Sequence, residues 1–288
     1  MGEKLLEGIG AEFMEKTKWK YVQETDQQKG LPQPPLELDY DKSKMIIDLP
    51  TPESIKVKSI DLRRAIENRR SIRNYLEQPL TLEELSFLLW CTQGVKEVLD
   101  PNEYLRRVGE FLKRAHVNEE QAEKILASYP RMSITSRTVP SGGAVHPFET
   151  YLLVNRVQGL HSGLYRFLAI KHKLVEISLD TGLANKIQAT LEHAPKSAVT
   201  FMWVAVPYRM VWLFGERSYR CLHIEAGHIC QNLYLAAQAI DSGVSSMLGF
   251  KDDAINGLLG IDGNEQFVIY AAAVGKSSRA TKSWKELG

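Results

Sequence analysis

Three arginines crowd one short stretch of the chain, Arg69-Arg70-Ser71-Ile72-Arg73, together with a hydroxyl group. A guanidinium is always charged, and its planar fork matches two phosphate oxygens at once. The stretch follows Ser59 to Asn68, a segment that favours a helix, and cations also stabilise the C-terminal end of a helix. The five residues alone therefore leave two interpretations open, an anion-binding segment and a solvated basic helix end.

Small residues form two further segments that could approach a flat ligand. These are Pro140-Ser141-Gly142-Gly143 and Gly243-Val244-Ser245-Ser246, and both are predicted to be loops. Glycine has no Cβ atom, so its backbone can come close to a ligand. Gly275-Lys276-Ser277-Ser278-Arg279 adds a second basic turn near the C-terminus. Together the segments suit a phosphorylated planar cofactor, although the residues do not name it.

Other chemistries find less support in the residue types. His223 and His228 stand five residues apart, about 140° around a helix, which makes one shared metal ion difficult. A core or interface role is favoured for them, and no metal site is expected. Ser141 lacks the G-x-S-x-G elbow of a serine nucleophile. The chain has no P-loop and no G-x-G-x-x-G after a strand, so a Rossmann nucleotide site is not expected.

The composition indicates a large soluble protein in a reducing compartment. The chain has 288 residues, 44% hydrophobic content and a formal net charge of +1. It can bury a large core, and it has no overall field that would attract nucleic acid or a membrane. Its three cysteines fit neither a disulfide framework nor a metal motif. With no apolar run suited to a signal peptide or a membrane span, a cytoplasmic location is expected.

The chain is predicted to consist of an N-terminal arm and one domain with an insertion. Residues 1–58 contain two proline-rich stretches that cannot continue a helix, so we expect an extended arm, lying across a neighbouring subunit or over its own surface. The domain spans residues 59–288. In it Thr81 and Glu84 form a capping box for a helix that ends at Gly94.

The insertion covers about residues 95–136 and differs from its surroundings in its high charge. Two amphipathic helices are predicted there, at about residues 102–116 and 119–128, the second with Asn118 as its N-cap. The insertion could be a lid over a site or an inert decoration, and decoration is favoured.

The remaining segments predict a sheet and one long helix. Residues 150–154, 163–168 and 173–179 suggest an antiparallel meander, and residues 198–206 and 266–274 are apolar enough to be buried strands. Residues 219–241 predict the longest helix. Because this helix is apolar nearly all round, it should be central or buried in a dimer interface.

Several motifs resemble one known family when they are taken together. Arg69 to Tyr75, continued by Leu80 to Leu85, resembles the N-terminal signature of the FMN-dependent nitroreductase superfamily. Val139 to Glu149 is similar to the branch called SagB-type dehydrogenases. Phe214 to Arg220, Glu225 to His228 and Gln231 to Leu233 are similar to the same branch. The resemblance covers roughly residues 60 to 276 without the insertion.

The resemblance implies a fold and a function. The fold would be α+β, a mostly antiparallel central sheet flanked by helices, in an intertwined homodimer with FMN at the interface. The protein would be an FMN-dependent oxidoreductase that transfers hydride through flavin N5 between NAD(P)H, or an organic substrate, and an acceptor. FMN would carry the chemistry, so no catalytic side chain is expected.

Alternative functions stay open. One is an azoline-to-azole peptide dehydrogenase of the SagB type. The members so characterised carry a Lys-Tyr pair where this chain has Leu213-Phe214, which disfavours that activity. A non-catalytic flavin-binding protein is a second alternative. A nucleic-acid binder would need a wider basic stripe and nearby aromatic platforms.

The resemblance also assigns cofactor-binding residues. Arg69, Arg70, Ser71 and Arg73 match the phosphate and ribityl contacts of the family. The segment beside the ring system and ribityl chain corresponds to Pro140, Ser141, Gly142 and Gly143. The residues whose backbone would pack against the edge of the flavin ring are Gly243, Ser245 and Ser246. Lys276 or Arg279 would supply a further phosphate contact.

Overall fold

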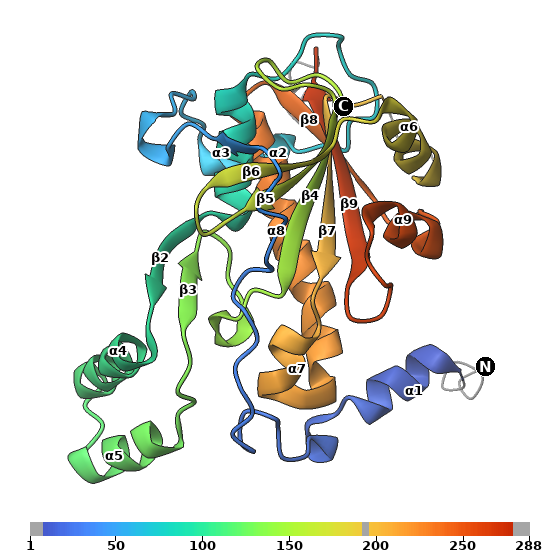
Figure 1. The fold of residues 1–288 in the computed structure, drawn as a ribbon. Coiled ribbons are helices and arrows are strands. Elements are labelled where there is room, and N and C mark those ends of the chain that lie inside the picture. The colour runs from blue at the N-terminus through green and yellow to red at the C-terminus, as the bar shows by residue number, and fades with distance from the viewer. Residues whose placement is uncertain (1–7, 192–195, 279–288) are drawn as a thin grey trace, which may run out of the picture.

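A seven-stranded sheet forms the centre of the computed structural model, which describes residues 8–191 and 196–278 (Figure 1). The strand order is β1-β6-β5-β4-β7-β9-β8, and all neighbouring strands are antiparallel. The strands are β1 (Ile46–Asp48), β4 (Phe148–Val154), β5 (Gly163–Leu168), β6 (Lys173–Ser178), β7 (Val199–Ala205), β8 (Ser242–Met247) and β9 (Phe267–Lys276). This sheet, with helices on both faces, confirms the expected α+β fold.

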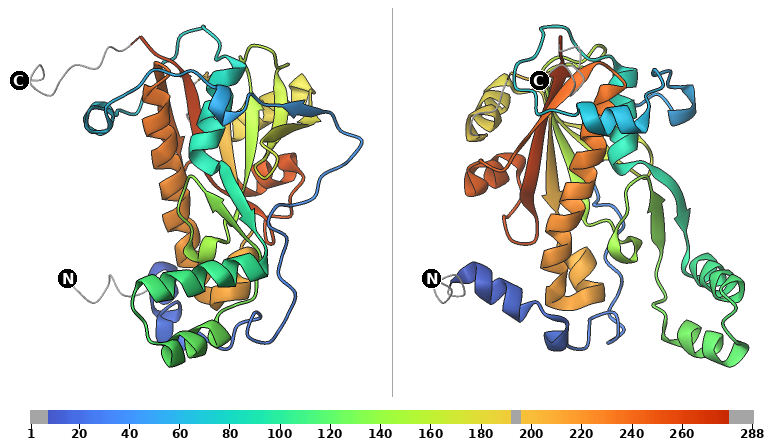
Figure 2. Two further views of the ribbon diagram at one scale, coloured as in Figure 1. Left: turned by 90° about the vertical axis from the view of Figure 1, so that its left-hand side faces the viewer. Right: turned by 180° about the vertical axis from the view of Figure 1, so that it is seen from behind.

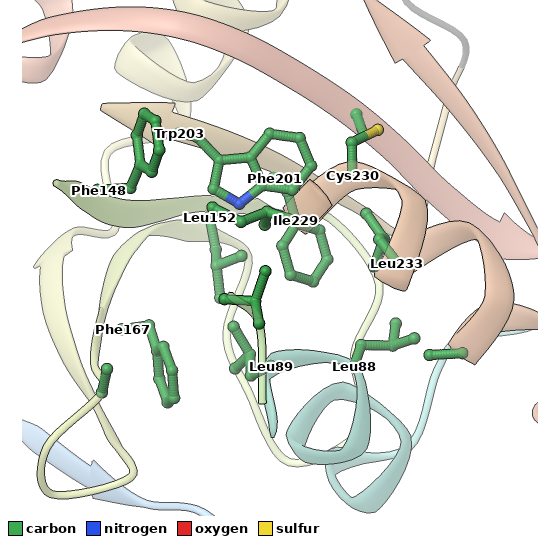
Figure 3. Packing of buried hydrophobic residues seen from close by; sticks show 14 of the residues in the cluster. Leu88, Leu89, Phe148, Leu152, Phe167, Phe201, Trp203, Ile229, Cys230 and Leu233 are labelled. Atoms are coloured by element: carbon green, nitrogen blue, oxygen red, sulfur yellow. The ribbon is translucent and has the colours of Figure 1, made fainter. Parts of the chain in front are cut away.

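Helices cover both faces of the sheet (Figure 2). On one face lie α3 (Leu82–Gln93) and α8 (Ser218–Gln238), and on the other lie α6 (Thr181–Thr190) and α9 (Asp252–Leu259). Successive side chains of a strand point to opposite faces. In β7, Phe201 and Trp203 accordingly pack with the α3 and α8 side chains (Figure 3), while Met202 and Val204 join the core under α6 and α9. The apolar run of β7 is therefore buried along its whole length.

The helix signals in the sequence are confirmed. α2 (Leu62–Asn68) starts after Asp61, whose carboxylate accepts a hydrogen bond from the Arg64 amide. α3 begins with the expected capping box of Thr81 and Glu84, and its C-cap is Gly94. None of the helices in the described part of the chain combines the length and hydropathy that a membrane-spanning segment needs.

The insertion projects from the body as a stalk with two helices (Figure 1). Its helices, α4 (Pro101–Arg114) and α5 (Glu119–Ser128), confirm the two that were expected. The stalk is an antiparallel ribbon of β2 (Val95–Leu99) and β3 (Ile134–Arg137), which the sequence did not predict. Its two ends meet, because the Thr138 amide donates to the Gly94 carbonyl oxygen at 2.9 Å.

The arm lies against its own chain, which is one of the two expected arrangements. It contains α1 (Ile9–Lys16), two 3-10 turns (Trp19–Tyr21 and Pro52–Ser54) and the edge strand β1. Side chains of the body hold its backbone. Trp212 Nε1 donates to the Leu31 carbonyl oxygen at 3.0 Å, and Arg209 Nε donates to that of Pro35 at 2.8 Å.

One predicted loop is wrong. The segment Gly243–Ser246 belongs to β8, an edge strand that pairs with β9 over its full length. The chain that follows α2 runs along the outer edge of β8, where the Ile72 amide donates to the Val244 carbonyl oxygen at 2.9 Å. Long-range pairing on both sides thus makes a strand from a segment in which only Val244 has a strong strand preference of its own.

Candidate functional site

The basic segment Arg69–Arg73 presents three positive charges at or near the protein surface. Within the described part of the chain, none of its three arginines forms an ion pair. The Arg70 guanidinium folds back on the backbone and donates to the carbonyl oxygens of Glu67 and Arg69, at 3.0 and 2.8 Å. The guanidinium carbon of Arg69 lies 5.3 Å from the centre of the Tyr234 ring. Three cations without a carboxylate partner make the electrostatic potential of this segment locally positive on a nearly neutral protein.

Tyr234 on α8 joins this segment to the edge strand. Its hydroxyl lies 3.0 Å from Ser71 Oγ, accepts from the Ser246 amide at 3.0 Å and lies 3.3 Å from Ser246 Oγ. The tyrosine itself is only 7% exposed. The structure therefore brings together two predicted site residues, Ser71 and Ser246, that are far apart in the sequence. Sequence reasoning missed Tyr234 because it counted the residue as part of an apolar helix face. A buried tyrosine hydroxyl needs a partner, and that was the available signal.

The other predicted residues of β8 lie deeper. Ser245 is 2% exposed. Gly243 is fully covered by the basic segment, because a Cβ atom on it would lie 2.4 Å from the Ile72 Cβ atom. The glycine is thus needed for the close approach of two chain segments. Its contact with a cofactor stays a prediction, and so does that of Ser245.

The segment Pro140–Gly143 is held in place by a buried carboxylate. The segment enters a 3-10 turn, Gly142–Ala144, between β3 and β4. Glu225 Oε1 on α8 accepts a hydrogen bond from the Gly142 amide at 2.7 Å. Burial raises the pKa of Glu225, while the bond to Gly142 opposes this rise. Ser141 Oγ accepts from the His146 amide at 3.0 Å, so the turn is rigidly tied to its surroundings. The sequence motif that contains Glu225 does not predict its contact with Gly142.

Within one chain the two halves of the predicted site do not meet. Glu225 and Tyr234 are nine residues apart on α8. That spacing is about 14 Å along the helix axis and half a turn around it. The segment Pro140–Gly143 and the basic segment therefore contact opposite sides of α8, at different heights.

The second basic turn is described only in part. Lys276 is 7% exposed, forms an ion pair with Glu84 and donates to the Ile240 carbonyl oxygen at 2.7 Å. Its ammonium group is thus engaged inside the body in this structure. Arg279 lies outside the described residues. The phosphate contact expected from this turn stays a prediction.

The histidines of α8 lie on an exposed face of the helix. An exposed stripe of this helix consists of His223, Ile224, Gly227, His228 and Gln231, and Ile224 is 58% exposed. The Phe13 ring of the arm packs edge-on against His223, with ring centroids 6.3 Å apart. No group of three metal-binding side chains occurs among residues 8–191 and 196–278.

Known proteins are similar to this chain in sequence or in fold. Residues 66–276 match the profile of the nitroreductase family. The protein MJ1384 of Methanocaldococcus jannaschii, which carries a nitroreductase name, is 30% identical over 222 residues, or 75% of this chain and 90% of that protein. The trifolitoxin-processing protein TfxB of Rhizobium leguminosarum is 28% identical over 133 residues, or 44% of this chain and 36% of that protein.

Two solved structures show the same fold. A protein of Ralstonia eutropha with a nitroreductase name superposes with a TM-score of 0.58 at 19% identity, covering 86% of this chain and 95% of that chain. A chain of the Escherichia coli microcin synthetase McbBCD complex gives a TM-score of 0.55 at 18% identity, covering 80% of this chain and 77% of its own length.

Proposed function

The chain belongs to the nitroreductase family, whose members are typically flavin-dependent oxidoreductases, and we propose that it binds FMN and transfers electrons between NAD(P)H, or an organic substrate, and an acceptor. The observation that carries the proposal is the group Arg69, Arg70 and Arg73. These arginines have no carboxylate partner among the described residues, and Tyr234 ties the segment to a strand predicted to lie at the flavin ring.

The residues present fit a flavin phosphate. Two or three guanidinium groups can neutralise a phosphate that carries close to two charges, and the exposed Ser71 hydroxyl adds a hydrogen-bond donor. Bound FMN would supply the electron chemistry, so the chain needs no nucleophile of its own. The tasks left to these residues are to bind the phosphate, orient the ring and limit access of water.

We propose that a homodimer completes the site. The basic segment of one copy and the segment Pro140–Gly143 of the other would then face one FMN. Two features support this arrangement. The two halves lie half a turn apart on α8, and the exposed residues Ile224, Gly227 and His228 lie on one face of that helix.

A second candidate function is peptide processing, as in the SagB-type branch. The similarity to the trifolitoxin-processing protein favours it, although this chain spans about a third of that protein. Against azoline oxidation stand Leu213 and Phe214, which have no group that could remove a proton and which pack against Gly143. A simple dehydrogenase or reductase is therefore the preferred proposal.

The cofactor can be tested directly. The protein purified without added ligand is expected to be yellow, with the two flavin absorption bands, and to lose that colour when NADH or NADPH is added without oxygen. Colourless protein that takes up no added FMN would contradict the proposal. FMN that binds but is reduced by no donor would indicate a flavin-binding protein without turnover. Oxidation of an azoline-containing peptide would favour the second candidate function.

A further inference from the structure

A cavity of about 590 Å³ lies at the end of the sheet where β7 ends and β9 begins, beside α7 (Tyr208–Phe214). Its walls come from the arm, from the chain between β7 and the start of α8, and from the loop before β9. A volume of this size is typical of sites for small organic ligands. None of the described residues assigned to FMN lines it, so the cavity is separate from the candidate flavin site.

Buried side chains hold the arm in place as one wall of this cavity. The wall consists of Pro34, Pro35 and Leu38. Arg209 Nε donates to the Pro35 carbonyl oxygen at 2.8 Å, and the Leu38 amide donates to Glu149 Oε1 at 2.9 Å. The side chains of Arg209 and Glu149 are 2% and 3% exposed and form an ion pair with each other. Because the wall is anchored in the core, the cavity is formed before a ligand arrives, as most ligand sites are.

The charge at the cavity is negative. Glu216 and Glu265 line it, both are exposed, and neither forms an ion pair within residues 8–191 and 196–278. Arg209, which also lines the cavity, is paired with the buried carboxylate of Glu149. Arg217, next to Glu216 in the sequence, donates to a backbone carbonyl oxygen of the arm at 3.0 Å. The two free carboxylates should therefore attract a cation.

Aromatic and apolar side chains provide a surface for the body of such a ligand. Tyr208 and Tyr219 line the cavity together with Pro207 and Val211. The face of an aromatic ring attracts a cation and also packs against apolar groups. Burial and the nearby charge of Glu216 raise the pKa of Tyr219, so a carboxylate and a ring lie close together at this site.

We propose that this cavity binds a small organic cation, an amine or amidine carried on an apolar or aromatic body. The positive group would pair with Glu216 or Glu265, and the body would pack on the tyrosine rings and on the wall formed by the arm. A neutral molecule of the same shape would lack the charge attraction, and an anion would be repelled. The site does not involve the flavin, so it goes beyond the proposed function.

Three probes of similar shape test the role of charge: benzamidinium is positive, benzamide is neutral and benzoate is negative. Binding to the full chain is followed by NMR of isotope-labelled tyrosine rings, and the signals of Tyr208 and Tyr219 are assigned with Tyr208→Phe and Tyr219→Phe. We expect benzamidinium to bind about tenfold more tightly than benzamide, the effect of one or two partly exposed ion pairs, and benzoate to bind least tightly. The signals of both tyrosines should shift when benzamidinium binds.

Conservative variants of the two carboxylates test where the charge attraction arises. Glu216→Gln and Glu265→Gln should each weaken benzamidinium binding about threefold and leave benzamide binding unchanged. Both positions are exposed, so the variants should fold normally. The matched control is Glu123→Gln on α5, which makes the same change of net charge at an exposed position that does not line the cavity. It should leave all three affinities unchanged.

Several results would overturn the proposal. It is wrong if benzamidinium and benzamide bind equally tightly, or if no probe shifts the signals of Tyr208 and Tyr219. It is also wrong if Glu123→Gln weakens benzamidinium as much as the two cavity variants do, because the effect would then reflect net charge alone. No flavin enters these measurements. A protein that binds no FMN can still show the expected pattern, so this proposal and the proposed function fail separately.

Discussion

Glu225 on α8 accepts a hydrogen bond from the backbone amide of Gly142 at 2.7 Å, and so fixes a turn that lies 83 residues earlier in the chain. Hydrogen bonds to a charged group contribute about 1.5–3 kcal/mol. We expect Glu225→Ala to lower FMN affinity about tenfold or more, and Glu225→Gln, which keeps an acceptor oxygen, to lower it less. Titration of FMN against the apoprotein measures both. Equal losses in the two variants would show that the hydrogen bond is not what matters.

The same carboxyl group should leave a signature in the pH dependence of stability. Burial raises the pKa of Glu225 above its ordinary value of 4.5. The carboxyl group of Glu225 therefore binds its proton more tightly in the folded chain than in the unfolded chain. This difference stabilises the folded state at low pH, and the stabilisation is lost as the pH rises from about 4.5 through the raised pKa. The free energy of unfolding of the wild type, minus that of Glu225→Gln, should decrease over this range and be level above it. Urea unfolding at several pH values checks the sign.

The buried pair of Arg209 and Glu149 should be costly to break. Their side chains are 2% and 3% exposed, and Glu149 also accepts from the Leu38 amide of the arm at 2.9 Å. Arg209→Met leaves a buried carboxylate without its cation, so the free energy of unfolding should fall by about 3–5 kcal/mol. Adding Glu149→Gln removes that charge and should restore part of the loss. A double variant that is less stable than Arg209→Met would contradict this account.

His146 should make the protein sensitive to acid. Burial, together with the positive charges of Arg137 and Arg209, lowers its pKa from 6.5 to about 3, and it bonds the Thr135 carbonyl oxygen at 3.0 Å. As the pH falls, the imidazole of His146 takes up a proton in the unfolded chain at a higher pH than in the folded chain. The free energy of unfolding should therefore decrease as the pH falls from 6.5 toward 3, by about 1.4 kcal/mol per pH unit.

The matched variant is His146→Asn. The residue has φ of 46°, a backbone region that asparagine tolerates better than most residues. This variant should show a flatter dependence of unfolding free energy on pH between 6.5 and 3. An unchanged slope would mean that other groups dominate acid unfolding.

Local signals in the sequence predicted much of the fold. Helix caps can be recognised from residues at most three positions apart. The capping box of Thr81 and Glu84 and the cap formed by Asn118 are of this kind, so the sequence predicted the two helices that follow them. β8 was not, because its small residues become a strand only through pairing with β9 and through the space that Gly243 leaves for Ile72. That information is spread over distant parts of the chain.

The residues of the candidate site also fall into two groups, those that the sequence alone predicted and those that required the tertiary structure. The charged residues of the basic segment could be singled out from their type and spacing. Tyr234 and Glu225 could not be assigned a role, because each acts on a segment that only the tertiary structure brings near: Tyr234 on Ser71, and Glu225 on Gly142. The sequence signal for such residues is a polar side chain at a position of a helix that is otherwise apolar, because a polar group buried there needs a hydrogen-bond partner.

Mixed dimers can test whether two copies share one site. Chains with Arg73→Ala and chains with Glu225→Ala each damage one half of the proposed site. In a dimer of the two, one site carries both defects and the other carries none. We therefore expect about half of the sites to regain wild-type FMN affinity, measured on dimers purified through two different tags.

A second mixed dimer is the control for this experiment. A chain with both substitutions, paired with a wild-type chain, gives one defect in each site and should recover no tight binding. If the site lay within a single chain, the results of the two mixed dimers would be reversed.

Gly243→Ala should separate the basic segment from the sheet edge. The new Cβ atom would lie 2.4 Å from the Ile72 Cβ atom, so the segment must move. Forced overpacking of this kind costs about 1–3 kcal/mol. FMN retention should fall together with the melting temperature.

Gly257→Ala on α9 is the matched control, because a Cβ atom there has no neighbour within 4 Å. It should stabilise the helix by up to about 1 kcal/mol and leave FMN binding unchanged. A Gly243→Ala protein with normal FMN binding would show that this close approach is not required by the site.

The stalk of β2 and β3 separates the tip of the insertion from the body. The chain leaves the body at Gly94 and returns at Thr138, where their backbones are hydrogen-bonded at 2.9 Å. The base of the insertion belongs to the core, because Leu99, Met132 and Ile134 are buried in it. We therefore expect the two helices at the tip, α4 and α5, to tolerate exchange for another segment of similar span, whereas the ribbon should be kept.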